Sequence, residues 1–383
     1  MKKSVISVSH IIFTICFWCS CSNTGQNHLE SIHVDIVDSL FISCYSDSCD
    51  ILFLKSDTVQ GQLGVVTRVM YDDGLFFVSH KPTSLSSDMQ QLIEVFDSTG
   101  TFVNQIGRIG RATNEYQGFR GWTVNPINKE VLICDDFRSR TIRYNYDGSY
   151  IGYYRNQDHL NNNQLFFSGN KVFYQNMIPS DIDDMAYYDE TGKFNAIFQE
   201  RKIKTEGFIM PGIRELSDCH TDTLYHIRPF DNILYSISDG RLNRGISLPF
   251  MPQLSKKDVR RIKTDSNLFK HIPLYGINTR DYYFLSIINE GVGTYAYEKR
   301  NNRWVRYTKA FYSDDLIMST QFVGVGLGND IIGVINFSEE DLKQLFEEDQ
   351  AIKTRFIESG YCDIDNPSLV IYHLRSLVSK ENF

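Results

Sequence analysis

The sequence has little proline, a shortage of positive charge and an excess of aromatic residues. There are nine prolines in 383 residues, against 22 tyrosines and 26 phenylalanines. Aromatic side chains favour pleated, half-buried surfaces, so the composition predicts mostly β-sheet. The formal net charge of −8 argues against general nucleic-acid binding, which requires a basic surface. A hydrophobic content of 42% supports a large core and excludes disordered, collagen-like and coiled-coil chains.

Familiar catalytic motifs are also missing. The sequence contains no G-x-S-x-G nucleophile elbow, no P-loop and no H-E-x-x-H zinc motif. The cysteines after residue 21 include no C-x-x-C pair and no His/Cys cluster with zinc-site spacing. Gly324, Gly326 and Gly328 alternate in an expected strand with no helix after them, so we interpret them as close packing near a central axis. We therefore predict neither a cofactor nor a metal.

The first 20 residues are typical of a bacterial signal peptide. Lys2 and Lys3 precede an apolar run from Val5 to Trp18, which is too short and interrupted to span a bilayer. The small Ser20 before Cys21 resembles a lipoprotein signal, in which the cysteine is lipidated and becomes the first mature residue. An ordinary secretory signal is the alternative. Residues 21–29 are then a polar tether.

Lipidation would place the protein in the cell envelope. Acyl chains anchor a protein because each buried CH₂ contributes about 0.8 kcal/mol. We expect an outer-membrane lipoprotein that faces the periplasm or the cell surface, and the absence of acidic residues just after Cys21 favours the periplasm. Such a compartment permits disulfides. Cys44 and Cys49 flank a turn-like Tyr-Ser-Asp-Ser segment and are a candidate pair, with unpaired thiols as the alternative.

The remainder of the chain is a repeat. An apolar strand is followed by an aromatic strand ending in Asp, a Gly turn and another strand, and the turn glycines Gly100, Gly148 and Gly192 mark the first three copies. Three weaker copies follow. The predicted strands lie at 75–78, 92–97, 102–106, 131–134, 141–147, 150–154, 172–174, 185–189, 194–198, 224–227, 232–237, 246–248, 282–285, 294–298, 304–307, 331–334 and 369–374.

A repeat of four-stranded antiparallel meanders predicts a β-propeller. A small sheet cannot bury both faces alone, whereas blades stacked in a ring bury them against one another. We predict an all-β, six-bladed propeller over residues 30–383. The last repeat lacks a strand, and residues 51–54 are expected to supply it and close the ring. Residues 338–357 are predicted to form a helical insertion in the last blade.

One loop carries a specific family resemblance. Gln105 to Tyr116 reads QIGRIGRATNEY and is followed by Asp135-Asp136-Phe137-Arg138-Ser139-Arg140. Together these resemble the six-bladed, NHL-repeat-like propeller lipoproteins of gut-type anaerobic bacteria, most of which have no determined function. The family loop usually reads G-R-G-P-G-E-Y. Here Ala112, Thr113 and Asn114 replace its Gly-Pro-Gly core.

The predicted strand order brings a set of arginines to one face of the ring, around the channel. Guanidinium groups bind carboxylate, sulfate or phosphate groups through paired hydrogen bonds. This rim predicts a site for a small anionic molecule, a glycan or a peptide terminus, and the 338–357 insertion is expected beside it. The candidate residues are Arg108, Arg111, Glu115, Tyr116, Asp135, Arg138, Arg140 and Arg228. The alternative is that the arginines pair with Glu115, Asp135, Asp136 and Asp231, and that Tyr116 is packing between blades.

Three functions remain open at this stage. The first is a lipid-anchored envelope protein that binds a ligand or partner and is not an enzyme. The second is a metal-dependent hydrolase or lyase, for which Asp135, Asn176, Asp231 and Asn289 could converge at the channel. The third is a scaffold that docks onto a larger envelope protein complex.

Overall fold

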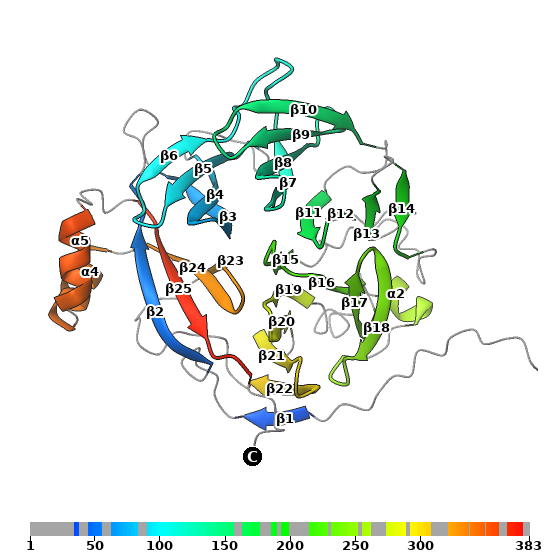
Figure 1. The fold of residues 1–383 in the computed structure, drawn as a ribbon. Helices are drawn as coiled ribbons and strands as arrows, with labels where there is room; N and C mark the ends of the chain where they lie inside the picture. The colour runs from blue at the N-terminus through cyan, green and yellow to red at the C-terminus, as the bar shows by residue number, and fades with distance from the viewer. Residues whose placement is uncertain are drawn as a thin grey trace, which may run out of the picture.

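The computed structural model is nearly all-β, and its sheets are arranged in a circle about a common centre, as in a propeller (Figure 1). The structure describes residues 34–37, 45–55, 63–82, 90–156, 163–176, 185–189, 193–198, 214–228, 231–251, 255–261, 273–288, 292–307, 321–336, 338–348, 350–359 and 366–377. Every strand predicted from the repeats overlaps an observed strand.

Antiparallel meanders make up each sheet. One four-stranded sheet holds β7 (Phe119–Asn125), β8 (Glu130–Asp135), β9 (Arg140–Asn145) and β10 (Tyr150–Arg155). The next holds β11 (Asn163–Ser168), β12 (Lys171–Asn176), β13 (Met185–Tyr188) and β14 (Phe194–Ala196). A three-stranded sheet holds β16 (Thr223–Ile227), β17 (Ile233–Ser238) and β18 (Arg241–Ser247).

Two larger sheets arise where neighbouring meanders join. The first runs β1 (Val34–Val37), β22 (Arg303–Tyr307), β21 (Val292–Glu298), β20 (Tyr282–Ile288), β19 (Pro273–Asn278) and β15 (Arg214–Ser217). The second runs β2 (Ser46–Phe53), β25 (Ser368–Leu374), β24 (Asp330–Ile335), β23 (Gln321–Val325), β3 (Val65–Asp72), β4 (Leu75–Lys81), β5 (Leu92–Asp97) and β6 (Phe102–Gln105). The joins are parallel pairings of β15 with β19 and of β23 with β3.

These parallel joins orient the turns. Since the first strands of adjacent meanders run in the same direction, the tight turns that follow them emerge on one side of the ring. We call this side the turn face. It carries residues 72–75, 218–222, 279–281, 299–302 and 326–329. The paired inner strands β23 and β3 are closely packed. A Cβ on Gly324 would lie 2.2 Å from the carbonyl oxygen of Val69, which agrees with the packing expected of that glycine.

Burial falls from the inner to the outer strands. All six residues of β8 are buried, on both faces of the strand. In contrast, β10 at the outer edge of the same sheet leaves Tyr150, Ile151 and Tyr153 exposed. An isolated sheet has one face in water, so the burial of both faces of β8 shows that neighbouring sheets cover it.

Two turn glycines contact a strand outside their own meander. Gly100 has φ +79°, and a Cβ there would lie 2.1 Å from the carbonyl oxygen of Phe53. Gly148 has φ +82°, and its Cβ would lie 2.5 Å from the carbonyl oxygen of Gln105. Phe53 ends β2, whereas Gln105 ends β6. The end of β2 therefore occupies, relative to the meander β3–β6, the position that the end of β6 occupies relative to the meander β7–β10.

The strand β2 pairs antiparallel with β25, with Ile51 opposite Val370 and Phe53 opposite Ser368.

The expected insertion forms two helices, α4 (Glu339–Glu348) and α5 (Gln350–Ser359). They lie outside the ring against β2 and not over the channel where we expected them (Figure 1). Phe356 contacts Phe53 there, with ring centroids 5.0 Å apart. The short α2 (Lys256–Arg261) follows β18. Within the described residues, no helix is both long and apolar enough to cross a bilayer.

The contact at Gly100 gives a first test. Gly74 also has positive φ, at +76°, but nothing lies within 4 Å of its added Cβ. Gly74→Ala should cost about 1–2 kcal/mol, from backbone conformation alone. Gly100→Ala should cost roughly 1–3 kcal/mol more, since the methyl displaces packed backbone. Urea unfolding measures both, and equal losses would contradict the placement of β2.

A second test concerns His373, on β25 between β2 and β24. Its Nε2 lies 3.2 Å from Asp50 and its Nδ1 lies 3.0 Å from Asp330. Burial lowers the pKa of His373, but the hydrogen bonds and charges of Asp330 and Asp50 outweigh it and raise the pKa overall. A raised pKa stabilises the fold below the unfolded-state pKa of about 6.5, and this stability is lost as pH rises through the folded-state pKa.

We therefore expect the urea midpoint of the wild type to fall between pH 6 and pH 8 by more than that of His373→Gln. The difference between the two proteins isolates the imidazole from other titrating groups. Parallel pH profiles would show that His373 does not stabilise the junction of these three strands.

Candidate functional site

The loop from Gly107 to Tyr116 contains half of the residues that the sequence predicted as a ligand site. Arg108 Nε lies 2.6 Å from Glu115 Oε1, and Glu115 Oε2 accepts a 2.7 Å hydrogen bond from the amide of Ala112. This backbone hydrogen bond and Arg108 hold the pKa of Glu115 below its usual range. Tyr116 is fully buried and packs against Phe119.

Arg138 and Arg140 fix the path of this loop. Arg138 donates to the carbonyl oxygens of Ala112, at 3.0 Å, and of Arg111. Arg140 donates to those of Thr113, at 3.0 Å, and Glu115, at 2.6 Å. Residues that replace the family's Gly-Pro-Gly core are thus held through their carbonyl groups. The remaining Arg140 nitrogen, Nε, lies 3.3 Å from Asp135 Oδ2.

The structure does not gather all the predicted residues into one group. Arg228 follows β16, away from the loop, and its guanidinium carbon lies 4.6 Å from the ring centre of Phe198. Asp231 is buried and accepts a 2.6 Å hydrogen bond from Tyr235. Arg111 is exposed. The predicted anion site therefore divides into the 107–116 loop, whose carbonyl groups accept from Arg138 and Arg140, and separate residues elsewhere. Its role in binding stays a prediction.

Some predicted residues lie outside what the structure describes. Cys21, Cys44 and Asn289 fall outside the described residues, as does the side chain of Asn176. Cys49 lies exposed on β2. Lipidation at Cys21, the Cys44–Cys49 pair and a metal site at the channel are therefore untested.

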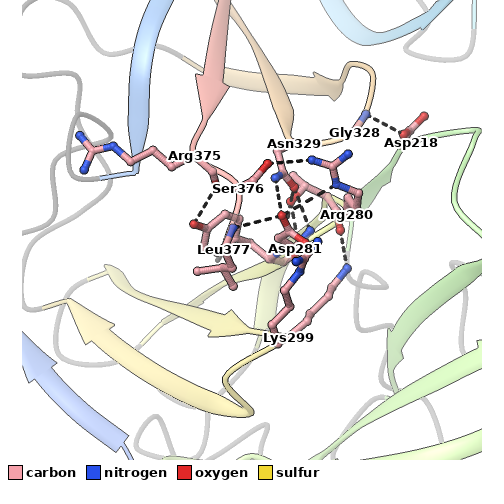
Figure 2. Close-up of polar contacts among 12 residues, drawn as sticks. Asp218, Arg280, Asp281, Lys299, Gly328, Asn329, Arg375, Ser376 and Leu377 are labelled. Carbon is pink, nitrogen blue, oxygen red and sulfur yellow. Dashed lines mark hydrogen bonds and ion pairs between the residues drawn. The ribbon is translucent and has the colours of Figure 1, made fainter. Parts of the chain in front are cut away.

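The turn face holds a pocket that the sequence did not reveal. Its cavity volume is about 690 Å³. It forms where turns from three consecutive meanders meet, with β15 and β16 on one side and β19 to β24 on the other. The lining residues are Asp218, His220, Thr221, Asp222, Thr223, Tyr225, Arg280, Lys299, Arg300, Leu327 and Gly328. Figure 2 shows the polar contacts beside this pocket.

Lys299 is the most constrained cation of the pocket. Its ammonium group donates to Asn278 Oδ1 at 2.6 Å and to the carbonyl oxygen of Thr279, and it lies 4.5 Å from the ring centre of Tyr225. Burial lowers the pKa of Lys299 to about 7, although Asp281 opposes the shift. A neutral amine has two N–H bonds, which these two acceptors satisfy. Ionisation adds a third N–H bond, close to the ring of Tyr225.

The buried carboxylate of Asp281 organises the neighbouring cations. Arg300 Nε lies 3.0 Å from Asp281 Oδ1, whereas Arg280 Nε lies 3.8 Å from Oδ2. Asn329 donates to the same Oδ2 at 2.8 Å, and the amide of Leu377 donates at 3.3 Å (Figure 2). One buried anion thus stands beside three cations that line the pocket, two of which keep their side chains about half exposed.

The opposite wall carries Asp218 and His220. Asp218 accepts hydrogen bonds from the amides of His220, at 2.9 Å, and Gly328, at 3.2 Å, and burial raises its pKa. With Cys219 these are the one group of three metal-capable side chains found among the described residues. Burial also raises the pKa of the Cys219 thiol, which favours the protonated form over the thiolate that binds metals. His220 Nε2 already lies 2.9 Å from Asp72, so protein contacts satisfy the group.

The chain belongs to the family described as a domain of unknown function, DUF4934, which matches residues 63–373. No curated protein matches the sequence. A solved structure of a Bacteroides fragilis protein assigned as exported has 13% identity and a TM-score of 0.63, covering 90% of this chain and all of that one. A DUF4221 member from Bacteroides vulgatus has 13% identity and a TM-score of 0.52, covering 86% of this chain and 97% of that one. At these identities the likeness concerns the fold alone.

The loop contacts predict that Arg140 is structural. Arg140→Ala would leave the fully buried Asp135 without its cation, which typically costs about 3–5 kcal/mol. Arg111→Ala, at an exposed position in the same loop, should change the free energy of unfolding by no more than about 0.5 kcal/mol. Urea denaturation of both variants measures the difference. A fully stable Arg140→Ala protein would restore Arg140 as a candidate ligand-binding residue.

Proposed function

We propose that this protein is a binding module of the cell envelope whose ligand is a small molecule with a carboxylate or phosphate group. The supporting observation is the set of three cations, Arg280, Lys299 and Arg300, on one wall of the turn-face pocket. Anionic oxygens of the ligand would accept hydrogen bonds from the Lys299 ammonium group and from N–H groups of Arg280 and Arg300. Asp222, exposed on the other wall, would select ligands that also carry a hydrogen-bond donor.

We further propose that the meanders are six blades, closed by β2. Counting β3–β6, β7–β10, β11–β14, β15–β18, β19–β22 and β23–β25 with β2 gives six units of four strands. The equivalent positions of Phe53 and Gln105 beside Gly100 and Gly148 support this count. In this arrangement β2, near the start of the chain, pairs with the last strand, β25, so the ring resists opening as one unit.

The direction of β1 supports a pocket that faces the membrane. The strand runs parallel to β22, with Val34 opposite Trp304 and Val37 opposite Tyr307. Its first residue, Val34, thus lies at the end of β22 nearest the Lys299 turn, on the turn face. If Cys21 is lipidated, residues 22–33 span at most about 40 Å. The proposed anchor is then that of an outer-membrane lipoprotein with its pocket near the bilayer. The exported assignment of the Bacteroides fragilis protein accords with such a location.

Anion titrations test the pocket. We expect phosphate or citrate to raise the melting temperature more than chloride does at equal ionic strength. Lys299→Met should weaken the binding of the responding anion about 10- to 100-fold, because a charge-assisted hydrogen bond is lost. For an anion whose own charge is constant over this range, binding should also be tighter at pH 6 than at pH 8, since the lowered pKa of Lys299, about 7, makes the ammonium form scarce above it.

Arg241→Ala is the matched control, because Arg241 is exposed beside another turn of the same face but does not line the pocket. It should leave the affinity unchanged. If Lys299→Met and Arg241→Ala bind the anion equally well, or no anion binds better than chloride, the pocket is not an anion site.

A further inference from the structure

A second pocket lies between the sheet of β7–β10 and the sheet of β11–β14, away from the cations around Lys299. Its cavity volume is about 750 Å³. Aromatic rings and aliphatic side chains share its wall with amides and charged groups. The lining residues are Asn125, Asn128, Glu130, Leu132, Arg143, Tyr154, Arg155, Asn170, Lys171, Val172, Tyr174, Tyr188 and Asp189.

A chain of hydroxyl groups ends at this pocket, and its direction follows from its donors. Thr141 donates its single proton to Asn156 Oδ1 at 2.8 Å. The 3.1 Å contact between Thr141 and Tyr174 must therefore be donated by Tyr174. By the same reasoning, the 2.8 Å contact between Tyr154 and Tyr174 is donated by Tyr154. The hydroxyl oxygen of Tyr154, a residue that lines the pocket, keeps an acceptor position that none of these contacts uses.

The pocket also holds a hydrogen-bond donor, the side-chain amide of Asn125. The Oδ1 atom of Asn125 accepts from the amides of Ile127, at 3.1 Å, and Asn128, at 3.2 Å, so its NH₂ group remains a donor. Asn125 is itself more than nine-tenths buried. Its amide orientation is fixed by these two contacts, which gives the pocket a directional donor on β7, at the opposite edge of the sheet from Tyr154 on β10.

Of the pocket's three cations, Arg143 and Lys171 are paired with acids of the protein, whereas Arg155 is exposed to solvent. Arg143 makes two hydrogen bonds to Glu130, of 2.9 and 2.5 Å, and their charges cancel. Lys171 contacts Asp239 and, at 3.0 Å, Asn170. An ionic ligand would have to compete with these pairs. The remaining polar groups suit a neutral ligand with alternating donors and acceptors.

The aromatic wall completes the chemistry. Tyr188 lies edge-on to both Tyr154 and Tyr174, with centroid distances of 6.1 and 5.5 Å, and Tyr154 and Tyr188 are only partly buried. Partly exposed rings offer apolar surface to C–H groups, as the flat faces of pyranose sugars require. We propose that this pocket binds a neutral saccharide, whose hydroxyl groups meet Tyr154 and Asn125 while its ring contacts the tyrosines.

The test uses neutral trisaccharides of glucose, galactose, mannose and N-acetylglucosamine, titrated by isothermal calorimetry and saturation-transfer NMR. At least one should bind the wild type. Tyr154→Phe keeps the ring but removes the acceptor, and should weaken that binding about 5- to 10-fold, the loss of one or two hydrogen bonds. Asn170→Trp places a bulky ring at the exposed mouth and should abolish it.

Tyr150→Phe is the matched control, since Tyr150 lies on the same strand but does not line the pocket. It should bind as the wild type does. Saccharide binding should also change little between about 0.05 and 0.5 M salt, whereas anion binding at Lys299 should weaken. The proposal fails if no trisaccharide binds, if both binding variants match Tyr150→Phe, or if only uridine or adenosine, added as polar non-sugar probes, compete for the site.

Discussion

The structure depends on one constraint, which is that a sheet of four short strands cannot remove both of its faces from water. β8 is buried throughout because other sheets cover it, whereas β10 at the rim keeps exposed aromatic residues. Covering every inner strand requires the sheets to follow one another around a circle. The same constraint explains the value of β2, since a last sheet that lacked its outer strand would expose the edge of β25.

The repeat made much of this fold predictable from sequence. Asp97 and Asp147 precede the turn glycines, and their carboxylates accept hydrogen bonds from the amides of Thr99, at 2.8 Å, and Ser149, at 2.9 Å. Because these turns are stabilised by residues close together in the sequence, the sequence alone predicts them. The strand at 51–54 could also be inferred, because the last repeat lacks one strand and another part of the chain has to supply it.

The turn-face pocket could not be predicted in the same way. Asp218, Arg280, Lys299 and Gly328 are far apart in sequence and meet only because the parallel pairing of inner strands brings their turns to one side. The arginines that the sequence did mark, Arg138 and Arg140, hold loop carbonyl groups instead. The sequence shows that a loop residue is charged, but it does not show which group that residue will contact in the folded protein. The Lys299-Arg300 pair in a turn was the available signal, and it is too common a pattern to single out.

The charges of this protein therefore serve two purposes. Arg140 with Asp135, and Arg143 with Glu130, neutralise one another and hold neighbouring strands together. At the turn face, Arg280, Lys299 and Arg300 stand together on one wall beside the buried Asp281, and this clustering of cations is what makes that wall suited to an anion. In the pocket between β7–β10 and β11–β14, Arg143 and Lys171 are each paired with an acid of the protein, which is why we assign it a neutral ligand.

The central claim is that the N-terminal strand β2 is an integral part of the ring. Hydrogen exchange followed by mass spectrometry measures this directly, because amides in a cooperative unit exchange only when the unit opens. We predict that the β2 amides bonded to β25 exchange as slowly as those of β24, in the middle of the same sheet. Exchange of β2 at the rate of an unprotected chain, with β24 still protected, would contradict the account.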